Sequence, residues 1–195
     1  MNEFNKNLPY GATPIDRNES KQLIPQHLQN LSELNEFEQK NILKAQIWLI
    51  SCKKKDFLTD TFLLKLHKKM FDEVWKWAGK YRLSNKNIGG EWQNVPLEVK
   101  KLLDNVRYWQ DNNIYPIDEI AVRLHHKLVF IHPFSNGNGR HARLYCDTFL
   151  KLNSQTPFTW GKMSYTSQST RKEYIEALRC ADNKDYTKLL KFVKS

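Results

Sequence analysis

Apolar side chains recur at intervals of three and four residues along most of the chain, which is the spacing of one face of an α-helix. The first 30 residues lack this pattern and read as an irregular arm with one short helix near residues 20–27. Beyond the arm, the pattern predicts a helix from residue 32 onward and further helices over residues 59–71, 96–109, 116–131, 138–152, 170–181 and 185–193. We therefore expect an all-α fold.

The widest apolar arc belongs to residues 116–131, so this helix is expected at the centre of the core. Pro133 disfavours α geometry at His132 and ends that helix, and the next helix is expected to start near Asn138. The helix that begins at residue 32, with Ser32 as its expected N-cap, carries a mixed stripe at helical spacing. The stripe consists of Leu34, Phe37, Glu38, Asn41, Ile42, Ala45 and Trp48.

The chain changes character between residues 81 and 95. A Gly89-Gly90 pair lies between two short segments of mixed polarity. Paired glycines permit the positive φ angles of tight turns, so this stretch predicts one small β-hairpin in an otherwise helical fold.

Length and composition narrow the class of protein. A chain of 195 residues suits one domain with an extension, and no apolar run is long enough to span a membrane. The N-terminus lacks the apolar stretch of a signal peptide. Three widely spaced cysteines, Cys52, Cys146 and Cys180, form neither a disulfide framework nor a zinc spacing, which indicates the cytoplasm.

The net charge is +10, from 31 basic and 21 acidic residues. Such a surplus suits nucleic acid, an anionic nucleotide or an acidic protein partner. The lysine-rich runs are dispersed along the chain, which favours an ordinary solvated surface, and no known nucleic-acid-binding motif accompanies them. A basic nucleic-acid-binding protein is therefore the weakest of the hypotheses considered.

The sequence HPFSNGNGRHAR, residues 132–143, joins the two helices expected at the centre. Gly137 and Gly139 allow a ligand to approach the backbone closely, and the N–H groups at a helix start attract anions. Arg140 and Arg143 lie three residues apart on the same helix, a pair suited to polyphosphate oxygens. Taken singly, each residue has a plainer role, such as a turn, a helix cap, or an ion pair between Arg143 and Asp147.

His132 is the candidate proton acceptor of this loop. Its imidazole has an ordinary pKa of about 6.5, so a neutral form is available near pH 7. The C-terminus of the preceding helix favours the protonated ring, whereas the neighbouring arginines oppose it. The sequence leaves the balance of these two effects open.

The same twelve residues resemble the signature of the Fic (Fido) family, HxFx[DE]GNGRxxR, at every defined position except 136. Much of the remaining chain, including GATPIDRNESKQLIP near the N-terminus, is similar to the Fic subgroup called mobile mystery protein B. The resemblance implies a Fic-type helical bundle with a β-hairpin flap. It also implies an N-terminal arm and helix over residues 1–55 and a Fic domain over residues 56–195.

The resemblance further implies a nucleotidyltransferase that moves AMP from ATP to a Tyr, Ser or Thr hydroxyl of a target protein, with His132 as general base and Mg²⁺ on the phosphates. Phe134 would anchor the loop, and a flap over residues 86–94 would hold the target by strand addition. A helix-turn-helix partner encoded nearby on a mobile element is expected as well. The implied phosphate-binding residues are Asn136, Gly137, Asn138, Gly139, Arg140 and Arg143, and the implied flap residues are Ile88, Gly89, Gly90 and Trp92, although the apolar ones would equally cover the core.

Asn136 is where the sequence departs from the family pattern, which has Asp or Glu as the Mg²⁺ ligand. Magnesium prefers charged oxygen ligands, so Asn136 is a weaker candidate that offers only a carbonyl oxygen. Two alternatives follow from this change. The protein would be a degenerate Fic module that binds nucleotide or a protein partner with little turnover, or it would transfer another nucleotide.

Many Fic proteins are inhibited by a glutamate in the pattern [ST]xxxE[GN], which pairs with the second arginine of the signature. Ser32 and Glu36 have this spacing, but Phe37 follows instead of Gly or Asn. The resemblance thus suggests an inhibitory Glu36–Arg143 pair, and a solvated Glu36 on an ordinary helix is the equal alternative.

Overall fold

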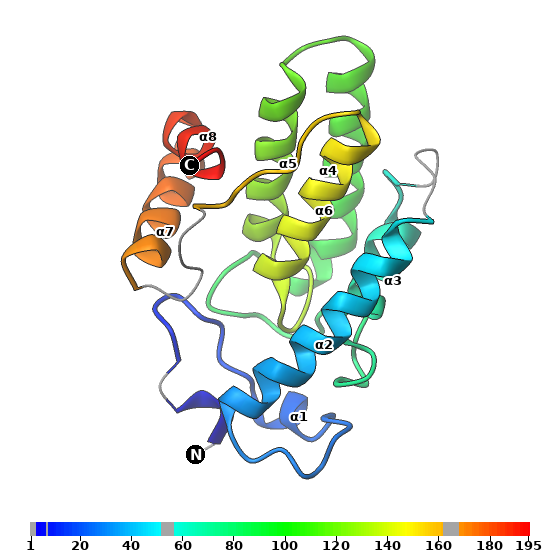
Figure 1. Ribbon diagram of the computed structural model, residues 1–195, viewed down its shortest axis with the longest axis vertical. Helices are drawn as coiled ribbons and strands as arrows, with labels where there is room; N and C mark the ends of the chain where they lie inside the picture. The colour runs from blue at the N-terminus through cyan, green and yellow to red at the C-terminus, as the bar shows by residue number, and fades with distance from the viewer. Residues whose placement is uncertain (1–2, 7, 52–56, 162–167) are drawn as a thin grey trace.

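The computed structural model describes residues 3–6, 8–51, 57–161 and 168–195, and Cys52 lies outside these ranges. Its elements are helical, and the described residues contain no strand beyond one isolated β-bridge between Leu23 and Trp75 (Figure 1). The elements are η1 Glu3–Asn5, α1 Arg17–Ser20, α2 Leu31–Leu49, α3 Asp60–Phe71, η3 Trp92–Asn94, α4 Val95–Asp111, α5 Ile117–Ile131, α6 Asn138–Leu152, α7 Gln168–Asp182 and α8 Thr187–Val193.

Helix α5 lies at the centre of the bundle, as its wide apolar arc predicts. It packs against α4, α6 and α8, while α2 pairs with α3 and α7 pairs with α8. Figure 1 shows α4, α5 and α6 side by side, with α7 and α8 to one side and α2 and α3 crossing the lower right. Both faces of α5 are buried, since Ile120, Ala121, Val122, Leu124 and Leu128 are at most 1% exposed.

The turn between α5 and α6 is set by two residues in the left-handed region. His132 caps α5 with a φ of 55°, and Gly137 precedes α6 with a φ of 77°. A Cβ added to Gly137 would lie 2.6 Å from the ring of Phe71, so only glycine fits there. A histidine at positive φ is strained, and such strain is more common at functional sites than elsewhere.

Two helix starts differ from the prediction. The N-cap of α2 is Asn30 rather than Ser32, because the Asn30 side chain accepts a hydrogen bond from the Glu33 N–H at 3.0 Å. The short helix of the arm covers Arg17–Ser20 instead of residues 20–27. Asp16 and Glu19 form a capping box that starts it early.

The predicted β-hairpin flap is not present. Residues 81–91 form bends and irregular backbone and lead into η3 without strand pairing. Arg82 explains the difference, because its guanidinium donates to the Ser84 carbonyl at 2.9 Å and to the Gly90 carbonyl at 2.6 Å. Asn85 also accepts from the Trp92 N–H at 2.9 Å. Side chains therefore satisfy backbone groups that a hairpin would pair across strands.

The N-terminal arm packs beneath the bundle instead of extending into solvent. Its β-bridge is supported by a hydrogen bond from the Ile24 N–H to the Val74 carbonyl at 2.8 Å. The arm is dark blue in Figure 1, where it passes between the lower end of α7 and the start of α2. Within the described ranges, no helix has both the length and the hydropathy needed to cross a bilayer.

Candidate active site

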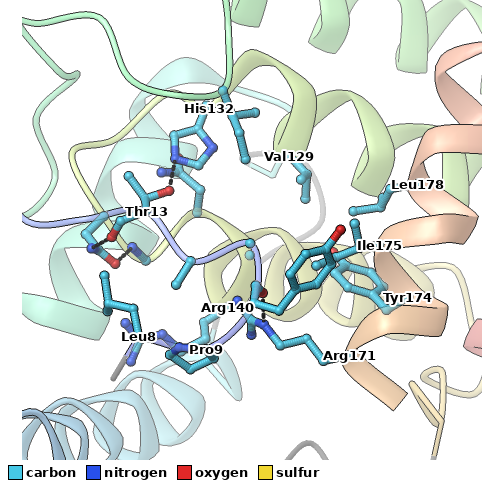
Figure 2. Close-up of a pocket in the computed structure, with 18 of the residues that line it drawn as sticks. Leu8, Pro9, Thr13, Val129, His132, Arg140, Arg171, Tyr174, Ile175 and Leu178 are labelled. Carbon is cyan, nitrogen blue, oxygen red and sulfur yellow. Dashed lines mark hydrogen bonds between the residues drawn. The ribbon is translucent and has the colours of Figure 1, made fainter. Parts of the chain in front are cut away.

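A cavity of about 660 Å³ lies where the α5–α6 loop, the first turns of α6, helices α2 and α7 and the N-terminal arm meet (Figure 2). This volume is within the range of small-molecule sites, about 300–1,000 Å³. His132, Asn136, Gly137, Asn138, Gly139, Arg140 and Arg143 all line it. The structure thus brings the residues of the loop signature together around one cavity, with Phe134 packed behind them.

His132 is 6% exposed, and its Nε2 lies 3.2 Å from the Thr13 hydroxyl. Burial lowers the pKa of His132 to about 4, and the positive charges of Arg82 and Lys86 act in the same direction. The Val129 carbonyl opposes this effect, because it favours the protonated ring. The imidazole is therefore neutral near pH 7, which decides the balance that the sequence left open.

Arg82 holds the backbone of His132 in place, a role that sequence reasoning missed. The residue is only 1% exposed, and its Nε donates to the His132 carbonyl at 2.7 Å. The backbone N–H of Arg82 donates to the Pro133 carbonyl at 2.9 Å, and its side-chain Nη2 donates to the Gly90 carbonyl. One side chain thus joins the end of α5 to the segment that the resemblance assigned to the flap. In a chain with 31 lysines and arginines, no sequence signal marks this one as buried.

Phe134 is fully buried and stacks on His67, with ring centroids 3.7 Å apart and an interplanar angle of 17°. His67 accepts a hydrogen bond from the Gly79 N–H at Nδ1, so its Nε2 donates to the Asn136 carbonyl at 3.1 Å. Burial lowers the pKa of His67 well below its usual value, which agrees with the neutral ring. The stack of Phe134 on His67 therefore holds the α5–α6 loop against α3.

The two asparagines of the loop bind the protein's own backbone. The Asn138 side chain accepts from the Phe134 N–H at 2.9 Å and donates to the Phe134 carbonyl at 2.8 Å. The Asn136 side chain accepts from the Gly137 N–H at 2.7 Å and donates to the Thr13 carbonyl at 3.2 Å. Donors for an anion would therefore be the N–H groups of the first turn of α6, which have no partner within the helix.

Gly139 leaves that first turn open to the cavity. A Cβ added at this position would meet no atom within 4 Å. The absence of a side chain therefore leaves the backbone of this turn open to the cavity.

Among the described residues, four arginines line the cavity, and two of them lie outside the signature. Arg140 and Arg143 come from α6, and Arg171 and Arg179 come from α7. Arg143 also lies over the Tyr174 ring, 4.5 Å from its centroid. The facing acids of the lining are Glu38 and Asp182, so the wall carries a positive surplus that suits a polyanion. The spacing of α7 alone did not reveal which of its faces would meet the loop.

The carboxylate of Asp147, for which the spacing allowed an ion pair with Arg143, binds the segment that follows α6. It accepts from the Trp160 indole N–H at 3.0 Å and from the Phe158 N–H at 3.2 Å. Burial raises the pKa of Asp147 to about 6 despite these bonds. Asp147 therefore ties the end of α6 to residues 158–160 and lies outside the cavity lining.

A buried carboxylate from α2 reaches Arg140, the first arginine of the signature. Glu38 is 3% exposed, and its two oxygens accept from Arg140 Nη1 at 2.6 Å and from the Trp75 indole N–H at 2.7 Å. Glu36, the residue selected by its spacing, is exposed and does not line the cavity. The sequence did contain a signal for Glu38, because it lies in the mostly apolar stripe of this helix. A carboxylate at such a position is expected to be buried and paired with a charged partner.

These residues do not fit a magnesium site held by the protein. Among the described residues, no group of three or more His, Cys, Asp or Glu side chains could hold a metal ion. The side-chain carbonyl oxygen of Asn136 accepts from the Gly137 N–H, and the carboxylate of Glu38 accepts from Arg140 and Trp75. Because Mg²⁺ needs charged oxygen ligands, the chain offers it little beyond what nucleotide phosphates would bring themselves.

The sequence model of the Fic/DOC family matches residues 57–150, which span α3 to α6 and contain the whole loop. The chain carries a Fic/DOC domain. Protein adenylyltransferase Fic from Aedes aegypti is 29% identical over 145 residues, covering 72% of this chain and 28% of the relative. Its counterpart from Culex quinquefasciatus is 30% identical over 145 residues, with the same coverage. The chain thus spans less than a third of the length of these curated relatives.

Solved structures share the fold of the Fic/DOC domain. Fic-1 from C. elegans has a TM-score of 0.68 at 24% identity, covering 90% of this chain and 51% of that chain. The N-terminal FIC domain of Bep8 from Bartonella sp. 1-1C has a TM-score of 0.70 at 14% identity, covering 93% and 96%. BepC from Bartonella tribocorum, solved with bound AMPPNP, has a TM-score of 0.69 at 16% identity, covering 92% and 97%. These likenesses establish the Fic fold and leave the activity to be argued from the site.

Proposed function

We propose that this protein is a protein adenylyltransferase that transfers AMP from ATP to a protein hydroxyl. The observation that carries the proposal is a buried, neutral imidazole whose Nε2 contacts a hydroxyl beside an arginine-lined cavity. A general base must lie within about 2.6–3.2 Å of the group it deprotonates, and His132 meets this condition toward the Thr13 hydroxyl, which marks the position that a target hydroxyl would take. The names of the curated relatives support the same reaction.

The chemistry assigns one role to each part of the site. His132 Nε2 accepts the hydroxyl proton as the oxygen bonds to the α-phosphorus of ATP. The bond from the α-phosphorus to its bridging oxygen breaks, and pyrophosphate leaves with the electron pair. The amides of the first turn of α6, together with Arg140 and Arg143, hold the β- and γ-phosphates and stabilise the charge that develops there.

The remaining family properties extend the proposal. Ile88 lines the cavity and Gly89 packs on His132, so residues 86–94 would contact the target even without a hairpin. Residues 1–55 would act as an arm and helix on a Fic domain over residues 56–195. A cytoplasmic location would follow from the cysteine spacing, whereas a helix-turn-helix partner and a mobile-element origin rest on the resemblance to mobile mystery protein B alone.

The direct test is incubation with ATP labelled at the α-phosphate and Mg²⁺. We expect label in protein and release of pyrophosphate, both lost in His132→Ala. An Arg17→Ala variant is the control, because Arg17 is exposed and outside the cavity lining. Label that persists in His132→Ala would contradict the assigned base.

Asn136 supports a second candidate, a Fic module that binds nucleotide with little turnover or that uses another nucleotide. The side-chain carbonyl oxygen of Asn136 is neutral and already accepts a hydrogen bond from the Gly137 N–H. Asn136→Asp supplies a carboxylate for the metal, so a large gain in pyrophosphate release would locate the weakness there. Comparing ATP, GTP, UTP and CTP in the wild type separates altered nucleotide choice from low turnover.

A further inference from the structure

The N-terminal arm is held against the cavity by contacts along its length. The Tyr10 carbonyl accepts from Arg171, and the Tyr10 hydroxyl accepts from Arg179 at 3.2 Å. Within the arm, the Ile15 backbone exchanges two hydrogen bonds with the Asn5 side chain, at 2.8 and 2.9 Å, which fix the shape of the arm. Figure 2 shows the arm crossing the cavity from Leu8 to Thr13 between His132 and the α7 side chains. The arm is therefore positioned as part of the site.

Thr13 contacts the loop with its hydroxyl and with its backbone carbonyl. Its hydroxyl lies 3.2 Å from His132 Nε2, and its carbonyl accepts from the Asn136 side chain at 3.2 Å. His132 Nδ1 is buried with no partner of strict hydrogen-bond geometry in the described part of the chain, and the Val129 carbonyl favours a proton on this ring. A proton on Nδ1 leaves Nε2 as the acceptor, so the Thr13 hydroxyl donates to the base.

Room for a nucleotide remains while the arm is in place. The cavity of about 660 Å³ exists with residues 8–13 forming part of its wall, and it reaches the glycines and Arg143. The arm thus supplies one wall and leaves the anion-binding wall accessible. Such an arrangement presents a hydroxyl to a bound ligand, whereas an arm that filled the site would block it.

The arm also lies against the segment assigned to target binding. The Lys86 ammonium pairs with Asp16 at 3.1 Å and with Glu19, and the Lys86 and Glu19 side chains are only 6% and 8% exposed. Asn87 and Ile88 line the same cavity as the arm. The position that a target segment would take next to His132 is therefore held by the chain's own residues.

We infer that Thr13 is a self-modification site, the hydroxyl to which this protein transfers AMP within one molecule. The inference rests on the proposed function, which supplies ATP as the second reactant. The Thr13 oxygen bonds to the α-phosphorus, its proton passes to His132 Nε2, and pyrophosphate leaves. The product is a phosphodiester between Thr13 and AMP.

The test is to incubate the full chain with α-labelled ATP and Mg²⁺ and to map the modified peptide by mass spectrometry. We expect AMP on Thr13 in the wild type, on the replacement serine in Thr13→Ser, and no label at this position in Thr13→Val or His132→Ala. Ser20→Ala is the matched control, because the Ser20 hydroxyl of the same arm donates to the Arg17 carbonyl, away from the cavity. The labelled fraction should be independent of protein concentration if the transfer occurs within one molecule.

Pyrophosphate release, followed in the same samples, separates this inference from the proposed function. Pyrophosphate release with AMP on another residue, or on no residue, would overturn the role of Thr13 and leave the enzyme class intact. Label in Thr13→Val equal to that in the wild type would overturn it as well. Pyrophosphate release from neither the wild type nor Glu38→Gln, a variant in which Arg140 no longer pairs with a carboxylate, would refute both. Because the site is mapped in the wild type, the result does not depend on the folding of any variant.

Discussion

Glu38 of α2 and Arg140 of α6 form an ion pair in which the carboxylate oxygen lies 2.6 Å from the guanidinium nitrogen. Arg140 belongs to the loop signature, so this pair places a negative charge where the proposed reaction would place a phosphate. We infer that Glu38, rather than Glu36, restrains nucleotide binding. The Trp75 indole N–H holds the second oxygen of Glu38 and keeps the carboxylate aimed at the loop.

Glu38→Gln should raise AMP transfer by on the order of tenfold, because an amide keeps the bond from Trp75 but no longer competes for Arg140. Initial rates with α-labelled ATP measure the effect. Glu36→Gln is the matched control, since Glu36 is exposed on the same helix. Equal rates in the wild type and Glu38→Gln, or a gain confined to Glu36→Gln, would refute the restraint.

Arg82→Met should lower both stability and turnover. The change leaves the buried His132 carbonyl without its donor, at a cost of about 1–3 kcal/mol, and also removes the hydrogen bond to the exposed Gly90. Urea unfolding measures the loss of free energy, and Arg17→Met serves as the exposed control. Because Arg82 positions His132 without touching substrate, we expect kcat to fall more than KM rises. A stability loss with unchanged kcat would limit Arg82 to a structural role.

The pH dependence should reflect the lowered pKa of His132, which is about 4 in the folded protein against an ordinary value of about 6.5. Transfer should rise with pH through about 4 and stay level toward neutrality, measured as kcat/KM against pH. A midpoint near 6.5 would show that the imidazole is not buried in the working enzyme.

The same pKa values link pH to stability. A buried neutral histidine binds its proton more weakly than the unfolded chain does, so it stabilises the fold above about pH 6.5 and loses this contribution as pH falls toward about 4. Burial lowers the pKa of His125 and of His141 to about 3, and both act in the same direction. The free energy of unfolding in urea should therefore fall between about pH 6.5 and 3, and His132→Gln should show a smaller loss over this window.

The two glycines of the loop should respond differently to alanine. Gly137→Ala should destabilise the fold by about 1–3 kcal/mol, since a Cβ would meet Phe71 and the φ of 77° is unfavourable for alanine. Gly139→Ala should leave the melting temperature nearly unchanged but weaken ATP binding, because its Cβ would point into open space at the anion-binding turn. Calorimetry for the fold and titration with ATP for binding separate the two effects.

Local patterns predicted the helices and the loop because both depend on neighbours in sequence. The periodicity of residues 116–131 and the pair Pro133 and Gly137 place the ends of α5 and α6 to within a residue. The flap prediction was wrong because the Arg82 side chain bonds the carbonyls of Ser84 and Gly90, and turn propensities do not include such side-chain contacts. The contacts of Thr13, Glu38 and Arg171 with the cavity join segments far apart in the chain, so only the folded structure brings them together.

The contact between Thr13 and His132 also bears on how the protein would select other substrates. A hydroxyl carried on the same chain has an effective concentration in the millimolar range or above, as linked groups roughly do. A foreign hydroxyl therefore has to arrive on a partner that docks strongly enough to displace residues 8–13 and the Lys86 ion pairs. Target proteins would then compete with Thr13 for the position beside His132. The strength with which residues 8–13 bind there would set the affinity that every target needs.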